Sequence, residues 1–385
     1  MLDGRQMMAS AKLALDTILQ QPTKGIPSKT LFMMQHTYIE RIAGVRSGDY
    51  RRDPEAVYLA MQRAVGTCLV DQWIPHNPLT MGDAGYEPDS EKRNTATTGA
   101  TKIVCDGLLI DSPEAVVAHL ERFVFPQIEV AIAGFDEQCR VQEIIEGERA
   151  VQSLLGPAML KTGYGIIQFP TLAYTRYGYE HYFMAYALYP EVIETHFRLQ
   201  ADLATLNNCA AARAYVQGQL PPLHRLDHVM ADSRGILVRP ETLDRMWFPH
   251  VARCLEPVLK SGVRLVWHCD GNLMDMVPRL LEVGLHGFQG FQYEDGMDYA
   301  RICRMRTRDG ESLIIMGGVS VPRTLPYGTP GDVRRELQWL VENGPRTGLF
   351  LGASSSITPG VPWENIATLI EGLAYYRTCG RRRGA

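Results

Sequence analysis

The sequence lacks paired cysteines, since its eight cysteines are scattered and never form a Cys-x-x-Cys motif. This spacing argues against a disulfide framework and a zinc knuckle, and it predicts reduced thiols. No apolar signal core follows Met1, and no apolar run approaches the length that spans a bilayer. The net charge of −4 offers no basic excess for nucleic acid. We therefore expect a cytoplasmic protein with no membrane or nucleic-acid partner.

The chain of 385 residues is long enough for one large barrel with insertions or for two domains. A regular alternation in its C-terminal part decides between them. Strand-like segments lie near 225–230, 263–268, 286–291, 312–316 and 348–351, and helix-like segments near 241–260, 273–283, 297–306, 330–342 and 362–377. Looser units begin near 31–34, 69–74 and 159–161. The pattern predicts an α/β protein, a (β/α)8 TIM-type barrel formed by residues 1–385 as a single domain.

Additions to this barrel are expected at three places. Residues 1–25 predict a lead-in helix, residues 78–111 a loop and hairpin, and residues 378–385 a disordered basic tail. Proline beside an acidic residue favours a helix start, because proline lacks the N–H that has no partner there and the acid meets the positive end of the helix dipole. Such starts occur at Asp53-Pro54-Glu55, Ser112-Pro113-Glu114, Tyr189-Pro190-Glu191, Arg239-Pro240-Glu241 and Thr329-Pro330-Gly331-Asp332.

The segment from Val263 to Asn272 carries the clearest functional signal. An apolar run ends abruptly in His268, Cys269, Asp270 and Gly271. In parallel α/β folds the C-terminal ends of the strands hold the chemistry, because the loops there surround one cavity. A buried cysteine and a simple Asp-Gly turn is the alternative interpretation.

Other polar residues follow the predicted strands in the same way. We expect His268, Asp270, Glu294 and Asp232 to be catalytic and to face one cavity, although Asp232 and Glu294 would also suit helix caps or arginine pairs. The paired Gly317-Gly318 fits a turn better than a phosphate loop. Substrate-binding residues are expected among the polar and aromatic residues of the same rim: Gln35, His36, Tyr164, Tyr182, Gln292 and Ser355.

Four motifs in the C-terminal two fifths carry a family resemblance. They are Arg239-Pro240-Glu241 after the Asp232 loop, His268-Cys269-Asp270-Gly271-Asn272, Gly317-Gly318-Val319 through Gly328-Thr329-Pro330, and Pro362-x-Glu364-Asn365-Ile366. In this order they resemble the uroporphyrinogen decarboxylase family, and within it the methylcobamide-dependent methyltransferases. The resemblance implies a TIM-type barrel whose mouth takes a tetrapyrrole-bearing partner or a small methyl donor or acceptor.

Two features depart from that family. The arginine-rich N-terminal motif with which the decarboxylase holds its substrate is not visible. Zinc-dependent methyltransferases of the family hold the metal with His, Cys and a late Cys, where this chain has His268, Asp270 and approximately Ser354. Cys269 is one residue out of phase, so its side chain should point away from His268. A divalent metal, zinc for example, would be held by His268, Asp270 and Glu294, or no metal is bound and Asp270 holds a protonated His268.

These observations lead to one principal functional hypothesis. We expect a methyltransferase that moves a methyl group between a small O- or N-methyl compound and a corrinoid, free or on a partner protein, as part of a demethylase system. A homodimer is compatible with this. The alternatives are a decarboxylase or lyase of the same family that acts on a cyclic or aromatic acid, and a non-catalytic binding protein.

Overall fold

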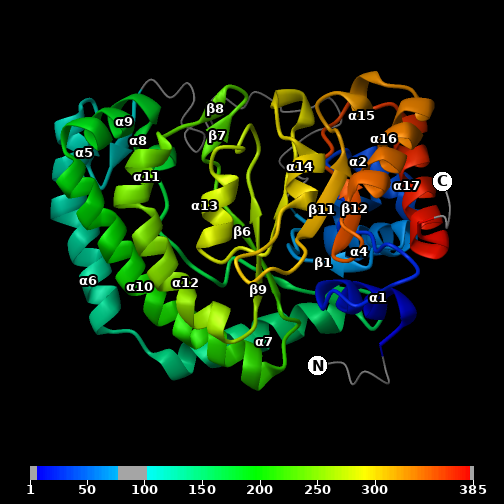
Figure 1. Ribbon diagram of the computed structural model, residues 1–385, viewed down its shortest axis with the longest axis horizontal. Helices are drawn as coiled ribbons and strands as arrows, with labels where there is room; N and C mark the ends of the chain where they lie inside the picture. The colour runs from blue at the N-terminus through cyan, green and yellow to red at the C-terminus, as the bar shows by residue number, and fades with distance from the viewer. Residues whose placement is uncertain (1–6, 77–101, 382–385) are drawn as a thin grey trace.

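The computed structural model describes residues 7–76 and 102–381, and Figure 1 shows them as strands surrounded by helices. The strands are β1 (Leu69–Val70), β2 (Val104–Cys105), β3 (Leu108–Leu109), β4 (Leu160–Lys161), β5 (Gly163–Tyr164), β6 (Leu223–Asp227), β7 (Ala231–Asp232), β8 (Gly235–Ile236), β9 (Arg264–His268), β10 (Gly287–Gln289), β11 (Ile314–Val319) and β12 (Leu349–Ala353).

The parallel strands close into a barrel. One sheet has the order β12-β11-β10-β9-β6-β5, with every pairing parallel. The extended segment of β5 begins in β4, and β4 pairs in parallel with β1. Residues Ser28 and Lys29 then bridge β12 on one side and β1 on the other. The circuit therefore passes through eight strand positions and returns to its start, which confirms the predicted barrel.

The predicted order of elements in residues 220–377 is confirmed. Strands β6, β9, β10, β11 and β12 are parallel, and a helix follows each of them. Their boundaries differ from the predicted ones by a few residues, and the segment expected as the Asp232 loop after β6 forms the short antiparallel hairpin β7–β8. His268 is the last residue of β9, as predicted.

The helices are α1 (Ala9–Ile18), α2 (His36–Ala43), α3 (Asp49–Arg52), α4 (Pro54–Val65), α5 (Pro113–His119), the π-helical η3 (Leu120–Val124), α6 (Phe125–Ala133), α7 (Glu137–Leu155), α8 (Tyr174–Tyr177), α9 (Tyr179–Leu188), α10 (Pro190–Gly218), α11 (Pro240–Met246), α12 (Phe248–Lys260), α13 (Val277–Glu282), the 3-10 turn η4 (Tyr293–Asp295), α14 (Tyr299–Arg304), α15 (Thr324–Tyr327), α16 (Pro330–Asn343) and α17 (Trp363–Cys379).

All five proline-marked helix starts are confirmed. Helices α4, α5, α10, α11 and α16 each begin at the proline of its motif. At α16, Thr329 and Asp332 form a reciprocal capping box in which each side chain accepts from the other residue's backbone N–H. Such a box satisfies two amides that have no partner inside the helix. The local rules of helix initiation therefore held at all five motifs.

The barrel interior has an apolar layer at one end and a polar layer at the other. Strand residues alternate between the interior and the surrounding helices, as a pleated strand requires. Leu69, Leu160, Val266, Ile314, Met316 and Phe350 form a buried cluster with Ala11, Ala14 and Ile18 of α1. Helix α1 thus packs against the end of the barrel where the strands begin, at the lower edge of Figure 1.

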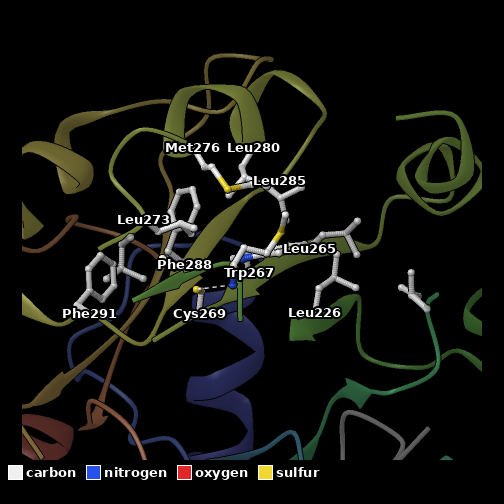
Figure 2. Close-up of a cluster of buried hydrophobic side chains, with 14 of the residues drawn as sticks. Leu226, Leu265, Trp267, Cys269, Leu273, Met276, Leu280, Leu285, Phe288 and Phe291 are labelled. Atoms are coloured by element: carbon white, nitrogen blue, oxygen red, sulfur yellow. Dashed lines mark hydrogen bonds between the residues drawn. The ribbon is translucent and has the colours of Figure 1, made fainter. Parts of the chain in front are cut away.

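Residues that alternate with the interior ones pack outward against the helices. Leu226 of β6, Leu265 and Trp267 of β9 and Phe288 of β10 belong to the large apolar cluster that Figure 2 shows in part. The Trp267 ring contacts Phe169 and Trp247, with ring centroids 5.1 and 6.0 Å apart. This outward packing fixes the register of β9, because a shift by one residue would turn every side chain to the opposite face.

The three expected additions lie partly outside the described residues. Helix α1 occupies the lead-in segment, and β2 and β3 form the predicted antiparallel hairpin. Residues 1–6, 78–101 and 382–385 of these additions lie outside the described part. Helix α17 continues to Cys379, and the Arg381 guanidinium donates to the Gly344 carbonyl at 3.2 Å. Residues 378–381 are therefore structured and not part of a tail. No helix among the described residues is long and apolar enough to cross a membrane.

The two adjacent glycines of β11 have different roles. They form neither a turn nor a phosphate loop, since both lie inside the strand. A Cβ at Gly318 would lie 2.1 Å from the backbone carbon of Ala353, whereas a Cβ at Gly317 would meet nothing closer than the Tyr299 hydroxyl at 3.4 Å. Gly318 is therefore required for the close approach of β11 and β12.

This difference predicts the stabilities of two matched variants. Gly318→Ala should lower the free energy of unfolding by on the order of 2 to 3 kcal/mol, because backbone atoms must move to admit the methyl group. Gly317→Ala should change it by no more than about 1 kcal/mol, of either sign. Urea denaturation of both variants measures the two free energies of unfolding. Equal destabilisation would show that β11 and β12 do not approach each other most closely at Gly318.

Candidate active site

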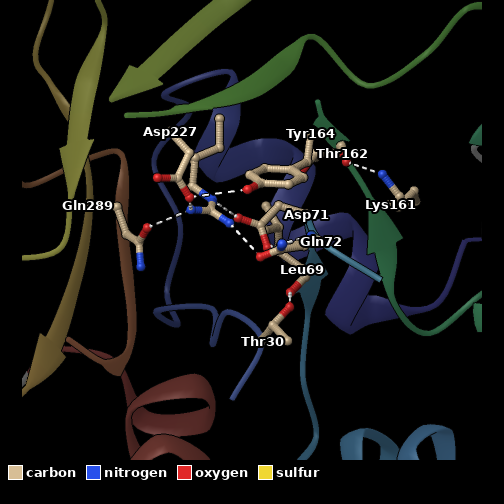
Figure 3. Close-up of polar contacts among 10 residues, drawn as sticks. Thr30, Leu69, Asp71, Gln72, Lys161, Thr162, Tyr164, Asp227 and Gln289 are labelled. Carbon is tan, nitrogen blue, oxygen red and sulfur yellow. Dashed lines mark hydrogen bonds and ion pairs between the residues drawn. The ribbon is translucent and has the colours of Figure 1, made fainter. Parts of the chain in front are cut away.

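A buried arginine organises the polar end of the barrel. Arg225, from the middle of β6, is 3% exposed and points into the interior. Its Nε lies 2.5 Å from Asp71 Oδ2, directly after β1, and its Nη1 lies 3.0 Å from Asp227 Oδ2. The remaining contacts are to amide oxygens, with Gln72 at 3.0 Å and Gln289 of β10 at 3.3 Å. Figure 3 shows how these groups converge.

The neighbours of Arg225 are held in the same network. The Tyr164 hydroxyl donates to Asp227 at 3.2 Å, and the guanidinium carbon lies 4.5 Å from the centre of the Tyr164 ring. Burial raises the pKa of Asp71, but Arg225, the Gln72 amide and Lys29 outweigh that effect and bring it below its usual range. Asp71 is therefore an ionised partner of Arg225 at neutral pH.

His268 and Asp270 lie together next to this network. The His268 Nε2 is 3.9 Å from Asp270 Oδ2, which is beyond hydrogen-bond distance. Burial lowers the pKa of His268, and the carboxylates of Asp227 and Asp270 counteract this only in part. Among the described residues, His268 Nδ1 and Asp270 Oδ1 are buried atoms without a hydrogen-bond partner. A neutral imidazole and a carboxylate are thus available here for a ligand.

Cys269, between these two residues, points the other way. Its sulfur accepts from the Met230 N–H at 3.4 Å, and the side chain belongs to the outer apolar cluster in Figure 2. Burial raises the pKa of the Cys269 thiol to about 12. The predicted orientation away from His268 is confirmed, and the thiol is protonated and separated from the barrel interior.

The three predicted metal ligands are not assembled into one site. Glu294 accepts a hydrogen bond from the Ser320 hydroxyl at 2.8 Å, and Ser354 accepts from the Val321 amide at 3.1 Å. Within residues 7–76 and 102–381, no group of three or more His, Cys, Asp or Glu side chains has the arrangement that a metal ion requires. His268 and Asp270 alone give two ligands, so we derive no chemical step through a metal.

Two other predicted residues support the loops of the site. Gln292 accepts a hydrogen bond from the Gly271 amide at 2.6 Å and so holds the loop that carries Asp270. Asp232 lies on the β7–β8 hairpin, where its carboxylate pairs with the exposed Arg234 at 2.9 Å. Its interactions are local, and the arginine pair considered for it in the sequence is the arrangement found.

The remaining predicted substrate residues do not share one location, since some lie in loops and others are buried between helices. Gln35 precedes α2, and its side-chain oxygen accepts from Gly360 at 3.3 Å, while His36 is buried with its ring 5.1 Å from that of Tyr50. Ser355 is partly exposed in the loop after β12. Tyr182 is completely buried among Tyr177, Phe183 and Tyr186 of the helical layer, which corresponds to the packing alternative for the tyrosine-rich segment.

Sequence reasoning missed Lys29, Asp71, Arg225 and Gln289, all of which line the interior. Asp71, Arg225 and Gln289 are polar residues within or directly after an apolar strand segment, whereas Lys29 lies between Ser28 and Thr30, before the apolar run 31–34. A charged residue in the middle of a strand that should be buried is itself a signal, because such a residue requires a partner. Arg225 at the centre of Leu223–Asp227 is the clearest example.

The ion pair of Asp71 and Arg225 predicts a large stability effect. Asp71→Asn should lower the free energy of unfolding at pH 7 by about 3 kcal/mol, because it leaves a buried guanidinium with one carboxylate in place of two. Asp232→Asn, which removes an exposed pair, should leave stability unchanged within error. Denaturation at pH 7 measures both, and an equally stable Asp71→Asn protein would contradict the central role of this pair.

Comparisons with known proteins agree with this geometry. Residues 228–375 match the family model described as uroporphyrinogen decarboxylase (URO-D). Among solved structures, the chain is similar to a methyltransferase from Methanosarcina mazei, with 16% sequence identity and a TM-score of 0.56. The similarity covers 95% of this chain and 98% of that one. No curated protein matches this sequence.

The matched segment begins at His228, directly after β6, and includes β9 with His268, β10 with Gln289 and Ser320 directly after β11. At its low identity, the similarity to the archaeal structure concerns the fold, which extends over the whole barrel. The C-terminal part of this chain, residues 228–375, is therefore similar to the uroporphyrinogen decarboxylase family.

Proposed function

We propose that this protein is a methyltransferase that moves a methyl group between a small methylated compound and a corrinoid, as part of a demethylase system. The family match and the fold shared with a protein named as a methyltransferase support this. The corrinoid is here a substrate, free or carried by a partner protein, and the partner would dock at the barrel mouth.

The observation that carries the proposal is the pair of His268 and Asp270. Their buried, unpartnered atoms lie at the polar end of the barrel, next to the Arg225 network. An ether oxygen or amine nitrogen is a poor leaving group, so its departure from the methyl carbon needs a hydrogen-bond donor or a proton at that atom. The reduced corrinoid would supply the nucleophile, and this chain would supply orientation and the proton.

The roles of the two residues follow from their surroundings. A neutral His268 can donate a hydrogen bond from Nε2 to the substrate heteroatom, since Nδ1 lies against Gly290, where an added Cβ would be 2.6 Å away. Asp270 Oδ2 is 3.9 Å from the same Nε2, and its negative charge favours the tautomer that carries the proton on Nε2. The outward packing of Trp267 holds the end of β9 in place, so that the ring is positioned by the barrel and not by a loop.

His268→Ala should therefore reduce methyl transfer by about a hundredfold or more while the protein stays folded, because the donor to the leaving atom is lost. The assay mixes the protein with a reduced corrinoid and a panel of methyl ethers and methylamines, and it follows the absorbance of the methylated corrinoid. His250→Ala, on the outer helix α12, is the matched control and should keep the wild-type rate.

Two results would contradict the proposal. A folded His268→Ala protein with the wild-type rate would exclude the role of the imidazole. If the wild-type protein transfers no methyl group from any compound of the panel, but releases carbon dioxide from cyclic or aromatic acids, then the decarboxylase alternative is correct.

A further inference from the structure

We propose that Lys29 is the general acid of this site: its ammonium group protonates the oxygen from which the methyl group departs, so the substrates are O-methyl compounds. The inference rests on the proposed function. In the step, the C–O bond breaks and the leaving oxygen takes a proton from Lys29 Nζ. The methyl carbon bonds to the cobalt of the reduced corrinoid, which supplies the electron pair. Solvent later returns the proton to the amine.

The barrel provides a defined place for the Lys29 side chain. Lys29 lies between β12 and β1, points into the interior and is only 4% exposed. Its aliphatic stem runs along Gly352 of β12, where a Cβ would lie 2.9 Å from Lys29 Cγ and 3.2 Å from Cε. Any larger residue at position 352 would therefore displace the lysine.

The ammonium group of Lys29 has no partner among residues 7–76 and 102–381. Neither a hydrogen bond nor an ion pair connects it to any of them. Lys161, which is also buried, differs in this respect, since its ammonium lies 2.9 Å from both oxygens of Glu148. A buried ammonium without a partner is costly, and such a group is a candidate for function.

The other cation of the polar layer cannot take this role. The nitrogens of Arg225 are used by Asp71, Asp227 and the two glutamine side chains. A guanidinium also keeps its proton at all relevant pH values. Lys29 is thus the cation with donors left for a ligand in the described part of the barrel interior.

The charges around Lys29 support a proton donor at neutral pH. Burial lowers its pKa, Asp71 and Asp270 raise it, and Arg225 lowers it, with the result that the pKa of Lys29 is about 8. His268 also faces this region, since Lys29 lowers its pKa. A group with a pKa near the working pH is mostly protonated and still gives up its proton readily.

The same charge selects the substrate. Methylated amines and quaternary ammonium compounds are cations, and a buried ammonium repels them because few water molecules screen the charge. A methyl ether is neutral, and negative charge develops on its oxygen as the methyl group leaves. Lys29 therefore stabilises the transition state of O-demethylation more than the bound substrate.

The test uses a series of aryl methyl ethers whose product phenols differ in acidity. Lys29→Met should slow transfer by about a hundredfold for the least acidic phenols and much less for the most acidic ones, because an acidic phenol leaves without a proton. Wild-type activity should fall as the pH rises through about 8, the pKa of Lys29, and the variant should lose this dependence. Gly352→Ala, which displaces the lysine, should give the same pattern.

Two controls separate chemistry from structure. Lys12→Met, on the outside of α1, should match the wild type in rate and in dependence on the leaving group. Lys29→Met should also raise the melting temperature below pH 8, where wild-type Lys29 is a buried charge. The gain should disappear as the pH approaches 10.5, because the unfolded lysine then loses its proton as well.

The outcomes are distinguishable. If the wild type transfers methyl groups and Lys29→Met keeps its rate and its dependence on the leaving group, the role of Lys29 is wrong although the proposed function stands. A wild type that prefers methylamines overturns the assignment of substrates. A wild type that transfers no methyl group overturns both proposals, and an unchanged melting temperature in Lys29→Met would show that the lysine is not a buried cation.

Discussion

The contact between Arg225 and the carboxylates of Asp71 and Asp227 is the constraint on which the polar end of the barrel depends. A guanidinium that is 3% exposed needs acceptors for its donors, and they come from three separate places in the chain. β1, β6 and β10 must therefore meet within a few ångströms, which happens only when the barrel is closed. The ion pairs and the closure support each other.

The two cations of the polar layer have different roles: Arg225 is structural, and Lys29 is proposed to act in the reaction. Arg225 pairs with two carboxylates and lowers the pKa of one of them, Asp71, while Lys29 lies nearby without a pairing partner among the described residues. The neutral His268 and the carboxylate of Asp270 stand on the adjacent strand end. An uncharged imidazole next to an ammonium group whose pKa is lowered to about 8 suits a reaction in which the oxygen of a neutral substrate gains a proton as the methyl group departs. The apolar layer behind α1 excludes water from the opposite end of the barrel.

The elements that could be predicted from the sequence are those controlled by neighbouring residues. The helix starts at Pro54, Pro113, Pro190, Pro240 and Pro330 are confirmed, because a proline and an adjacent cap act within one turn. The position of His268 at the end of β9 is confirmed for the same reason, since an apolar run marks the strand and its polar end marks the rim. The orientation of Cys269 followed from the alternation of side chains along an extended segment.

The sequence by itself thus determined the order of strands and helices, the parallel barrel and the strand that carries His268. Only the tertiary structure decided which polar residues share a site. Asp232 and Glu294 follow strands as expected, but their carboxylates already have partners. Asp232 pairs with Arg234, and Glu294 accepts a hydrogen bond from Ser320. Lys29, Asp71 and Arg225 come from distant parts of the chain and meet through barrel closure. Which distant side chains pair with each other depends on barrel closure and on which face of each strand points into the interior. No local sequence pattern contains this information.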